Sequence, residues 1–343
     1  MIELLDPKLG QDAARIADLK TDGAEIVDTY DEQLAELAEI REPSAAQPTP
    51  VTDAGEQFAY YPWRHTLARI VGEAAYQELR TNRNKNLLTA EEQERFAAAR
   101  VGFAGLNVGN PGAVCVALEG GARKMKLADL DALSLTNLNR FRAGLPDLGV
   151  NKATLTAHQI LEIDPYYEIE LHDAGIQPQT VDAFLGEPKL DVLVEEMDAL
   201  PLKIMVRESA KRLRVPVVMV TGNSEGVLLD VERYDTDPDL PILNGLLDES
   251  VRQQALAPET AKLSRREKAH LARAFVGKHH LEERLNESFE EFGRSLAGIP
   301  QLAESSFLRG AVLCFAVKAI ILGRSLDSGR YAIAFDRHMQ KVA

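Results

Sequence analysis

A glycine-rich turn followed by two carboxylates is the first pattern in this chain that could do chemistry. From Arg100 to Asp131 the sequence reads RVGFAGLNVGNPGAVCVALEGGARKMKLADLD. It predicts a strand, a glycine-rich turn, a helix and a second strand, the order of a nucleotide-binding βαβ unit. Backbone N–H groups of such a turn bind phosphate, and acids after the second strand bind ribose hydroxyls. Asp129 follows Gly105 by 129 − 105 = 24 residues, close to the roughly 20 expected in dinucleotide folds.

Polar and cationic side chains follow this strand end within the next 23 residues of the printed sequence. They are Asn137, Arg140, Arg142 and Lys152. An enzyme that uses a nucleoside triphosphate needs such cations, because the β- and γ-phosphates must be held and the leaving pyrophosphate neutralised. A dinucleotide-dependent redox protein would leave them unexplained, so an NAD- or FAD-binding protein ranks lower. The alternative is that these residues form a solvated basic loop with no role in binding or catalysis.

Four segments in this order resemble the ThiF/MoeB superfamily, which also contains the ubiquitin-activating enzymes. They are RTNRN (80–84), the glycine-rich turn with LADLD (127–131), LTNLNR (135–140) with LGVNKA (148–153), and EEMDAL (195–200). The close resemblance covers about a third of the chain. It implies an ATP- and Mg²⁺-dependent enzyme that adenylates the C-terminal carboxylate of a small ubiquitin-like protein or peptide and releases pyrophosphate. A non-catalytic nucleotide-binding or scaffold subunit of the same fold is the second hypothesis.

The resemblance also assigns roles to individual residues. It places Gly105, Asn107 and Gly109 in the phosphate loop, Asp129 at the ribose and Asp131 nearby. Asn137, Arg140 and Lys152 would contact the triphosphate, and Asp198 would bind Mg²⁺, which prefers hard oxygen ligands. Arg83 would reach the triphosphate of a partner subunit, so catalysis would require a homodimer. Arg83, Arg140, Lys152 and Asp198 are therefore the expected catalytic residues.

The chain departs from the family pattern in three places. Asn107, Val108 and Asn110 stand where the loop usually has glycine, and β-branched Val108 predicts a different backbone path or a less close approach to phosphate. Glu196 adds a carboxylate beside Glu195, and it could face solvent or the metal. The only cysteines are Cys115 and Cys314. Since neither belongs to a Cys-x-x-Cys pair, no zinc is expected, and both are expected to be buried.

The order of elements predicts an α/β fold with a doubly wound, mostly parallel Rossmann-like sheet and an added antiparallel hairpin. Strands are expected at 101–104, 124–128, 168–172, 190–195, 216–221, 227–231 and 330–335. Helices are expected near 112–119, 152–163, 179–186 and 201–212, and again at 259–296 and 302–322. Three parts are expected: a helical N-terminal extension (1–79) with a linker at 43–54 and a helix beginning near Pro62, a nucleotide-binding domain (80–250), and a mostly helical C-terminal extension (251–343) that completes it.

Composition limits the partners and the compartment. The net charge of −14 over 343 residues argues against nonspecific binding to nucleic acid or anionic membrane, because both need a basic surface. Two cysteines cannot form a disulfide framework and fit a reducing compartment. The N-terminus lacks the features of a signal peptide, and the most apolar stretch, 310–323, is interrupted by Lys318. A cytoplasmic protein is expected.

Overall fold

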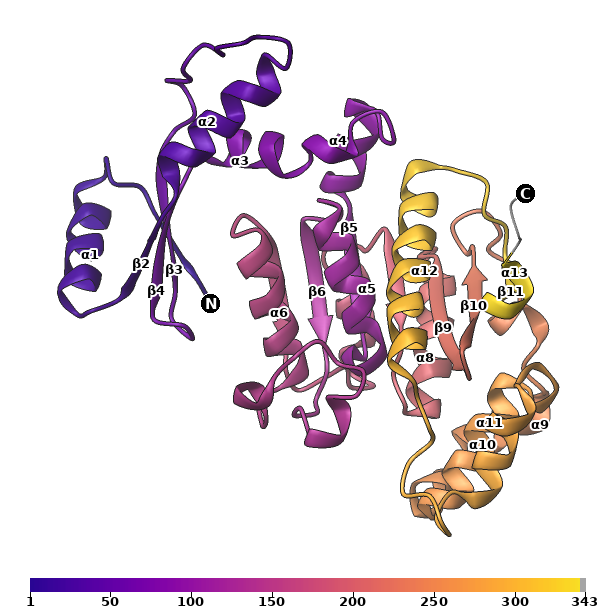
Figure 1. Ribbon diagram of the computed structural model, residues 1–343. Helices are drawn as coiled ribbons and strands as arrows, with labels where there is room; N and C mark the ends of the chain where they lie inside the picture. Colours follow the sequence, from indigo (N-terminus) through magenta and orange to yellow (C-terminus); the bar gives the residue numbers. More distant parts are fainter. Residues whose placement is uncertain (340–343) are drawn as a thin grey trace. The chain divides into compact units, whose positions relative to one another are not determined.

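The computed structural model describes residues 1–339, which divide into two compact units. The first unit contains residues 1–94, 117–120 and 158–167, and the second contains the remainder. Each unit has its own sheet: four strands in the order β1-β3-β4-β2, and seven in the order β11-β10-β9-β8-β5-β6-β7 (Figure 1). The α/β class and the mostly parallel larger sheet confirm the fold predicted from the sequence.

The first unit is built around a small mixed sheet. β1 pairs antiparallel with β3, β3 antiparallel with β4, and β2 parallel with β4. Its elements are β1 (Glu3–Leu5), α1 (Gly10–Thr21), β2 (Glu25–Asp28), α2 (Tyr30–Arg41), β3 (Gln57–Tyr61), β4 (Thr66–Ile70), α3 (Glu73–Arg80) and α4 (Ala90–Ala98), of which α4 runs on into the second unit. Leu19, Phe58 and Leu67 are buried between α1 and this sheet.

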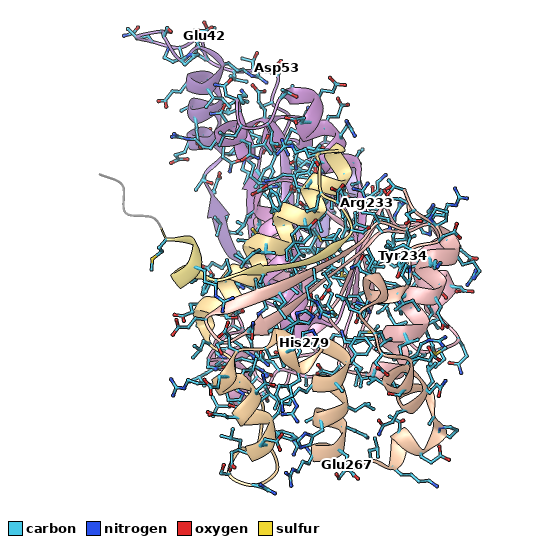
Figure 2. All side chains as sticks on the ribbon, turned by 90° about the vertical axis from the view of Figure 1, so that its right-hand side faces the viewer. Glu42, Asp53, Arg233, Tyr234, Glu267 and His279 are labelled. Carbon is cyan, nitrogen blue, oxygen red and sulfur yellow. The ribbon has the colours of Figure 1, made fainter. Side chains whose placement is uncertain are left out.

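The prediction that residues 1–79 are only helical needs correction. The segment from Tyr60 to Arg80, expected as one helix, forms the end of β3, a turn, β4 and then α3. Its apolar residues match a helical face, but in a run this short they also fit a strand, and pairing with β3 decides for β4. The expected linker at 43–54 has no regular structure, and Glu42 and Asp53 mark its two ends in Figure 2. Arg41 anchors it through ion pairs with Asp53 (3.2 Å) and Glu78 (2.8 Å).

The second unit holds the larger sheet. β5 (Arg100–Ala104), β6 (Lys124–Ala128), β7 (Glu168–His172), β8 (Val192–Glu195) and β9 (Val217–Asn223) are parallel. β10 (Gly226–Glu232) forms the expected antiparallel hairpin with β9, and β11 (Gly329–Ile333) pairs antiparallel with β10. The chain passes from β5 to β6 and β7 on one side and later to β8 and β9 on the other. The carboxyl ends of β5 and β8 are therefore the topological switch point, where ligands bind in such sheets.

Helices cover both faces of this sheet. They are α5 (Leu106–Leu118), α6 (Lys152–Ile163), α7 (Val181–Gly186) and α8 (Leu200–Leu213). α5 lies beside the long helix α12 (Ala303–Leu322) on one face (Figure 1). A Cβ on Gly310 would lie 2.8 Å from the carbonyl oxygen of Pro111, so only glycine permits this approach. The side chains of α7 and α8 pack with Leu193 and Val217 on the opposite face.

The C-terminal region completes the second unit. α9 (Glu249–Leu256), α10 (Arg265–Val276) and α11 (Glu283–Glu291) form a helical group in which Figure 2 labels Glu267 and His279, and α13 (Phe335–His338) follows β11. α12 is long and apolar enough to cross a membrane, but 67% of its apolar stretch is buried within the fold. It is therefore the core helix of this unit, as its apolar sequence predicted.

Candidate nucleotide site

The turn after β5 differs from the loop that the glycine pattern predicts. α5 begins at Leu106, so Asn107, Val108 and Gly109 lie within its first turn. In the segment 105–109 only Gly105 has a positive φ (+89°). A Cβ on Gly105 would lie 2.4 Å from the carbonyl oxygen of Glu196. Glycine is required there because the ends of β5 and β8 touch. The expected helix start at Gly112 is wrong, because α5 begins at Leu106.

Asp129, directly after β6, holds this turn in place. Its Oδ2 accepts a hydrogen bond from the Leu106 N–H (2.6 Å), and its Oδ1 accepts one from the Asp131 N–H (2.8 Å). Burial raises the pKa of Asp129, against the effect of these two bonds. The residue assigned to ribose thus also satisfies one of the N–H groups that a phosphate loop would otherwise leave open.

Asp131 and Lys152 form the next part of the site. Lys152 begins α6 and is 5% exposed, and its Nζ lies 3.1 Å from Oδ2 of the exposed Asp131. The Lys152 N–H also donates to the backbone oxygen of Asp131 (2.9 Å). The strand end and the start of α6 are therefore tied together by backbone and side chain, and the lysine points to the carboxylate that follows β6.

Arg140 lies in the loop between β6 and α6 and is half-buried. Its Nη1 donates to the Thr136 carbonyl (3.1 Å) and to Asn139 Oδ1 (2.8 Å), whereas its buried Nε has no hydrogen-bond partner within residues 1–339. Burial lowers the pKa of Arg140, and the nearby Asp198 carboxylate opposes this. A half-buried guanidinium with an open N–H is suited to bind an anionic oxygen.

A cavity of about 320 Å³ brings half of the predicted residues together at the carboxyl ends of β5, β6 and β8. Its lining includes Gly105, Asn107, Asp129, Asp131 and Asp198. Arg140 and Lys152 are linked to it through Asp198 and Asp131.

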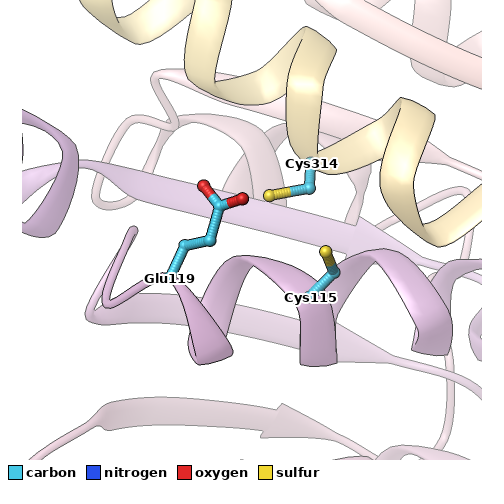
Figure 3. Close-up of side chains that lie close together, drawn as sticks. All are labelled: Cys115, Glu119 and Cys314. Atoms are coloured by element: carbon cyan, nitrogen blue, oxygen red, sulfur yellow. The ribbon is translucent and has the colours of Figure 1, made fainter. Parts of the chain in front are cut away.

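Three predicted residues have other positions. The buried Asn137 accepts hydrogen bonds from the N–H and Oγ of Ser134 (both 3.0 Å) and so shapes its own loop. Gly109 lies inside α5, and Arg83 is an exposed residue of the first unit. The two cysteines lie elsewhere: the sulfur atoms of Cys115 on α5 and Cys314 on α12 and a carboxylate oxygen of Glu119 lie within 4.8 Å of one another (Figure 3).

The two carboxylates at the end of β8 point to opposite faces of the sheet. Glu195 is fully buried and forms ion pairs with Lys203 (3.1 Å) and Arg207 of α8, and Arg207 also pairs with the buried Glu232 (2.8 Å). Burial alone would raise the pKa of Glu195, but the two cations hold it below its usual value.

Glu196 behaves differently from its neighbour. It is 8% exposed, and its Oε1 accepts a hydrogen bond from the Val220 N–H (2.6 Å). Burial raises the pKa of Glu196 to about 8. The expectation that Glu196 faces either solvent or metal is thus corrected in one respect, because the side chain is buried. It lines the cavity described above and a second cavity beyond it.

Sequence reasoning missed Arg309, which lines that second cavity. It lies on α12 and is 3% exposed. Burial lowers the pKa of Arg309 to about 10, with Glu196 opposing and Arg140 adding to the shift. The sequence does contain a signal for Arg309, because a buried arginine in an otherwise apolar helix needs a polar partner.

Comparison with known proteins identifies the family. The sequence profile of the ThiF family matches residues 80–257, just over half of the chain. The chain belongs to the ThiF family. A further relative, "Uncharacterized protein MT1398" of Mycobacterium tuberculosis (strain CDC 1551 / Oshkosh), is 38% identical over 310 residues, which are 90% of this chain and 42% of that protein. This chain therefore spans less than half the length of that curated relative.

Solved structures share the ThiF-type fold. E. coli tRNA N6-threonylcarbamoyladenosine dehydratase, TcdA, superposes with a TM-score of 0.53 at 17% identity, covering 74% of this chain and 96% of that one. Its complex with AMP superposes with a TM-score of 0.51 at 16% identity, over 74% and 97% of the two chains. At these identities the similarity establishes the shared fold.

Proposed function

We propose that this ThiF-family protein is an ATP- and Mg²⁺-dependent adenylyltransferase that activates a carboxylate as an acyl-adenylate. The observation that supports this most directly is the grouping of Gly105, Asp131 and Asp198 around one cavity at the switch point, with Arg140 beside Asp198. AMP bound to TcdA, a protein of the same fold, is consistent with a nucleotide in this cavity.

The donor set fits a triphosphate with its metal. Arg140 has a buried Nε with no protein partner among the described residues, and Lys152 adds a second cation, so these two would bind the β- and γ-phosphates. The exposed carboxylate of Asp198 would hold Mg²⁺, which neutralises phosphate charge when bound. Asp129 would accept hydrogen bonds from ribose hydroxyls while retaining its bonds to Leu106 and Asp131.

The reaction follows from this placement. A carboxylate oxygen of the acyl substrate attacks the α-phosphorus of ATP and forms a new O–P bond. The bond from the α-phosphorus to the bridging oxygen breaks, and pyrophosphate leaves with that electron pair. No proton has to move, so Arg140 and Lys152 act by orientation and by stabilising the negative charge that develops on the leaving group.

Two finer parts of the proposal concern partners. The acyl substrate expected from the family resemblance is the C-terminal carboxylate of a ubiquitin-like protein or peptide. The protein is also proposed to act as a homodimer in which Arg83 of one subunit reaches the triphosphate of the other. If Arg83 acts in trans, mixing the inactive variants Arg83→Ala and Arg140→Ala should restore about a quarter of wild-type activity, because subunit exchange rebuilds one intact site per mixed dimer. If it acts within its own chain, mixing restores nothing.

Pyrophosphate exchange tests the central claim. In the presence of ATP, Mg²⁺ and a panel of carboxylates, the wild type should incorporate labelled pyrophosphate into ATP. Arg140→Ala and Asp198→Asn should each lower exchange on the order of a hundredfold, as loss of one charge-stabilising group does in other enzymes. Arg294→Ala and Asp239→Asn, at exposed positions, are the matched controls and should keep it. Exchange that is unchanged in Arg140→Ala contradicts the proposal.

One observation favours a second candidate, a non-catalytic scaffold subunit. The Leu106 N–H is already bonded to Asp129, so the turn offers one donor fewer to phosphate. Titration calorimetry separates the two candidates, since a scaffold that has lost its nucleotide shows no heat of ATP binding with Mg²⁺, whereas the adenylyltransferase does.

A further inference from the structure

A second cavity of about 210 Å³ adjoins the nucleotide cavity. The two share Glu196, Met197 and Asp198, the segment that follows β8. The rest of its lining comes from β9, α8 and the C-terminal helices and is mostly apolar, including Met219, Phe275, Val276, Leu281, Leu285 and Phe289. A molecule in this cavity would therefore have one end directed at the nucleotide site and its other end among aliphatic and aromatic side chains.

The cavity has one cationic wall, formed by Arg309. Its Nε donates to the Ser305 carbonyl and its Nη2 to Gln301 Oε1, both at 3.3 Å. Within residues 1–339 no carboxylate lies within ion-pair distance of its guanidinium, and the Glu196 carboxylate of the same lining accepts a hydrogen bond from the Val220 N–H instead. The other cation of this lining, Lys203, is already paired with Glu195. A buried cation without a counter-charge is unfavourable, and an anionic ligand would relieve that cost.

The geometry points to a ligand class: we propose that this cavity binds the acyl part of the substrate, and that the substrate is a small apolar carboxylic acid in place of the peptide C-terminus that the family resemblance implies. This inference rests on the function proposed above. The carboxylate would lie at Arg309, next to the shared wall where the α-phosphate of ATP must come, and the hydrocarbon part would fill the apolar lining. Burial of its methylene groups would then favour binding.

Size and polarity distinguish this class from others. A dry cavity of roughly 150 Å³ holds benzene, so this one accommodates an aromatic ring with a short side chain or a branched chain of similar volume. A peptide that ends in Gly-Gly would bring amide groups against the apolar side chains that form most of the lining, and desolvating amides without new hydrogen bonds is unfavourable. The cavity therefore favours a hydrocarbon acid over a glycine-rich tail.

Direct binding and exchange test the proposal on the full chain. The probes are hexanoate, phenylacetate and 3-(4-fluorophenyl)propanoate, compared with acetate and a peptide ending in Gly-Gly, with ¹⁹F NMR for the fluorinated acid. Apolar acids should bind saturably and should support pyrophosphate exchange at least tenfold better than acetate or the peptide. Arg309→Gln should raise the KM for the acid at least tenfold and leave ATP affinity within about twofold.

A matched pair of variants separates occupancy of the cavity from general damage. Ala272 lines the cavity and Ala274 is exposed on the same helix, α10. Ala272→Phe should abolish acid binding, whereas Ala274→Phe should leave it unchanged. The proposal is overturned if no apolar acid binds saturably with or without ATP, or if only the Gly-Gly peptide supports exchange. The latter result would leave the proposed adenylyltransferase function intact, whereas loss of ATP binding in the wild type would remove that function instead.

Discussion

Glu195 and Glu196 are neighbours in sequence, and they have opposite surroundings. Glu195 faces α8, where Lys203 and Arg207 balance its charge and Arg207 continues to Glu232. Glu196 faces the two cavities, and its only hydrogen bond among the described residues comes from the Val220 N–H. A strand directs successive side chains to opposite faces, so one strand end supplies a structural acid and a site acid. Both carboxylates are buried, so their different roles follow from the charged groups and hydrogen-bond donors around them.

The largest loss of stability is expected when the buried ion pairs of Glu195 are broken. Arg207→Met leaves Glu195 and Glu232 buried without their shared cation, and removal of one partner of a buried ion pair costs about 3–5 kcal/mol. The free energy of unfolding, measured by urea denaturation at pH 7, should fall by that amount. A loss below about 1 kcal/mol would show that the network does not stabilise the fold.

Glu196 should instead affect how the stability of the fold depends on pH. The pKa of Glu196 is about 8 in the folded protein, against 4.5 for an ordinary glutamate. The folded state therefore holds a proton that the unfolded state has lost, so this stabilising contribution is complete below about pH 4.5 and is lost as pH rises towards 8. Glu196→Gln removes this dependence.

The variant should accordingly gain about 2–4 kcal/mol relative to the wild type between pH 5 and pH 8.5, by the linkage of about 1.4 kcal/mol per pKa unit. Urea denaturation of both proteins at the two pH values measures the difference, and the other titrating groups cancel in it. Parallel stability profiles would mean that Glu196 ionises normally and that its cavity is wetter than the structure indicates.

Asp129 and Asp131 form a similar pair at the end of β6, where smaller effects on stability are expected. Asp129→Ala removes the acceptor of the Leu106 and Asp131 N–H groups, and a buried donor left unsatisfied costs about 1–3 kcal/mol. Stability should fall by about 2 kcal/mol, and the Leu106 amide should exchange its hydrogen faster because the start of α5 loosens. An unaltered exchange rate at Leu106 would argue against Asp129 as the brace of the turn.

The smallest effect on stability is expected at Asp131. Its side chain is 56% exposed in the pair with Lys152, and exposed pairs contribute about 0–1 kcal/mol. Asp131→Asn should therefore change the free energy of unfolding by less than about 1 kcal/mol, measured by the same urea titration. A loss as large as that of Asp129→Ala would place Asp131 among the structural acids.

The strands of the larger sheet were predictable because their signal is local. The segments 124–128 (KMKLA) and 168–172 (EIELH) contain alternating polar and apolar residues, and their predicted limits are those that the structure has. The grouping of the acids after β6 and β8 was predictable for another reason, because parallel strands bring their carboxyl ends to one edge.

What the sequence could not provide depends on contacts between distant residues. Gly112 and Gly310 were expected in helices, but no local pattern reveals that α5 and α12 approach each other closely at these two glycines. The strand at 66–70 needed its partner β3 to be distinguished from a helix. Arg309 needed the cavity opposite α12 before it could be connected with the site.

The turn after β5 bears on how such chains are found by their sequences. Only Gly105 combines positive φ with a carbonyl oxygen at 2.4 Å from its missing Cβ, whereas positions 107, 108 and 110 are ordinary helical positions that accept other side chains. A search that demands the full set of loop glycines would reject this protein although its sheet, its acids and its cations are in place. A pattern that requires one glycine after the first strand, the acid after the second and the downstream Asn-Leu-x-Arg and lysine would find it.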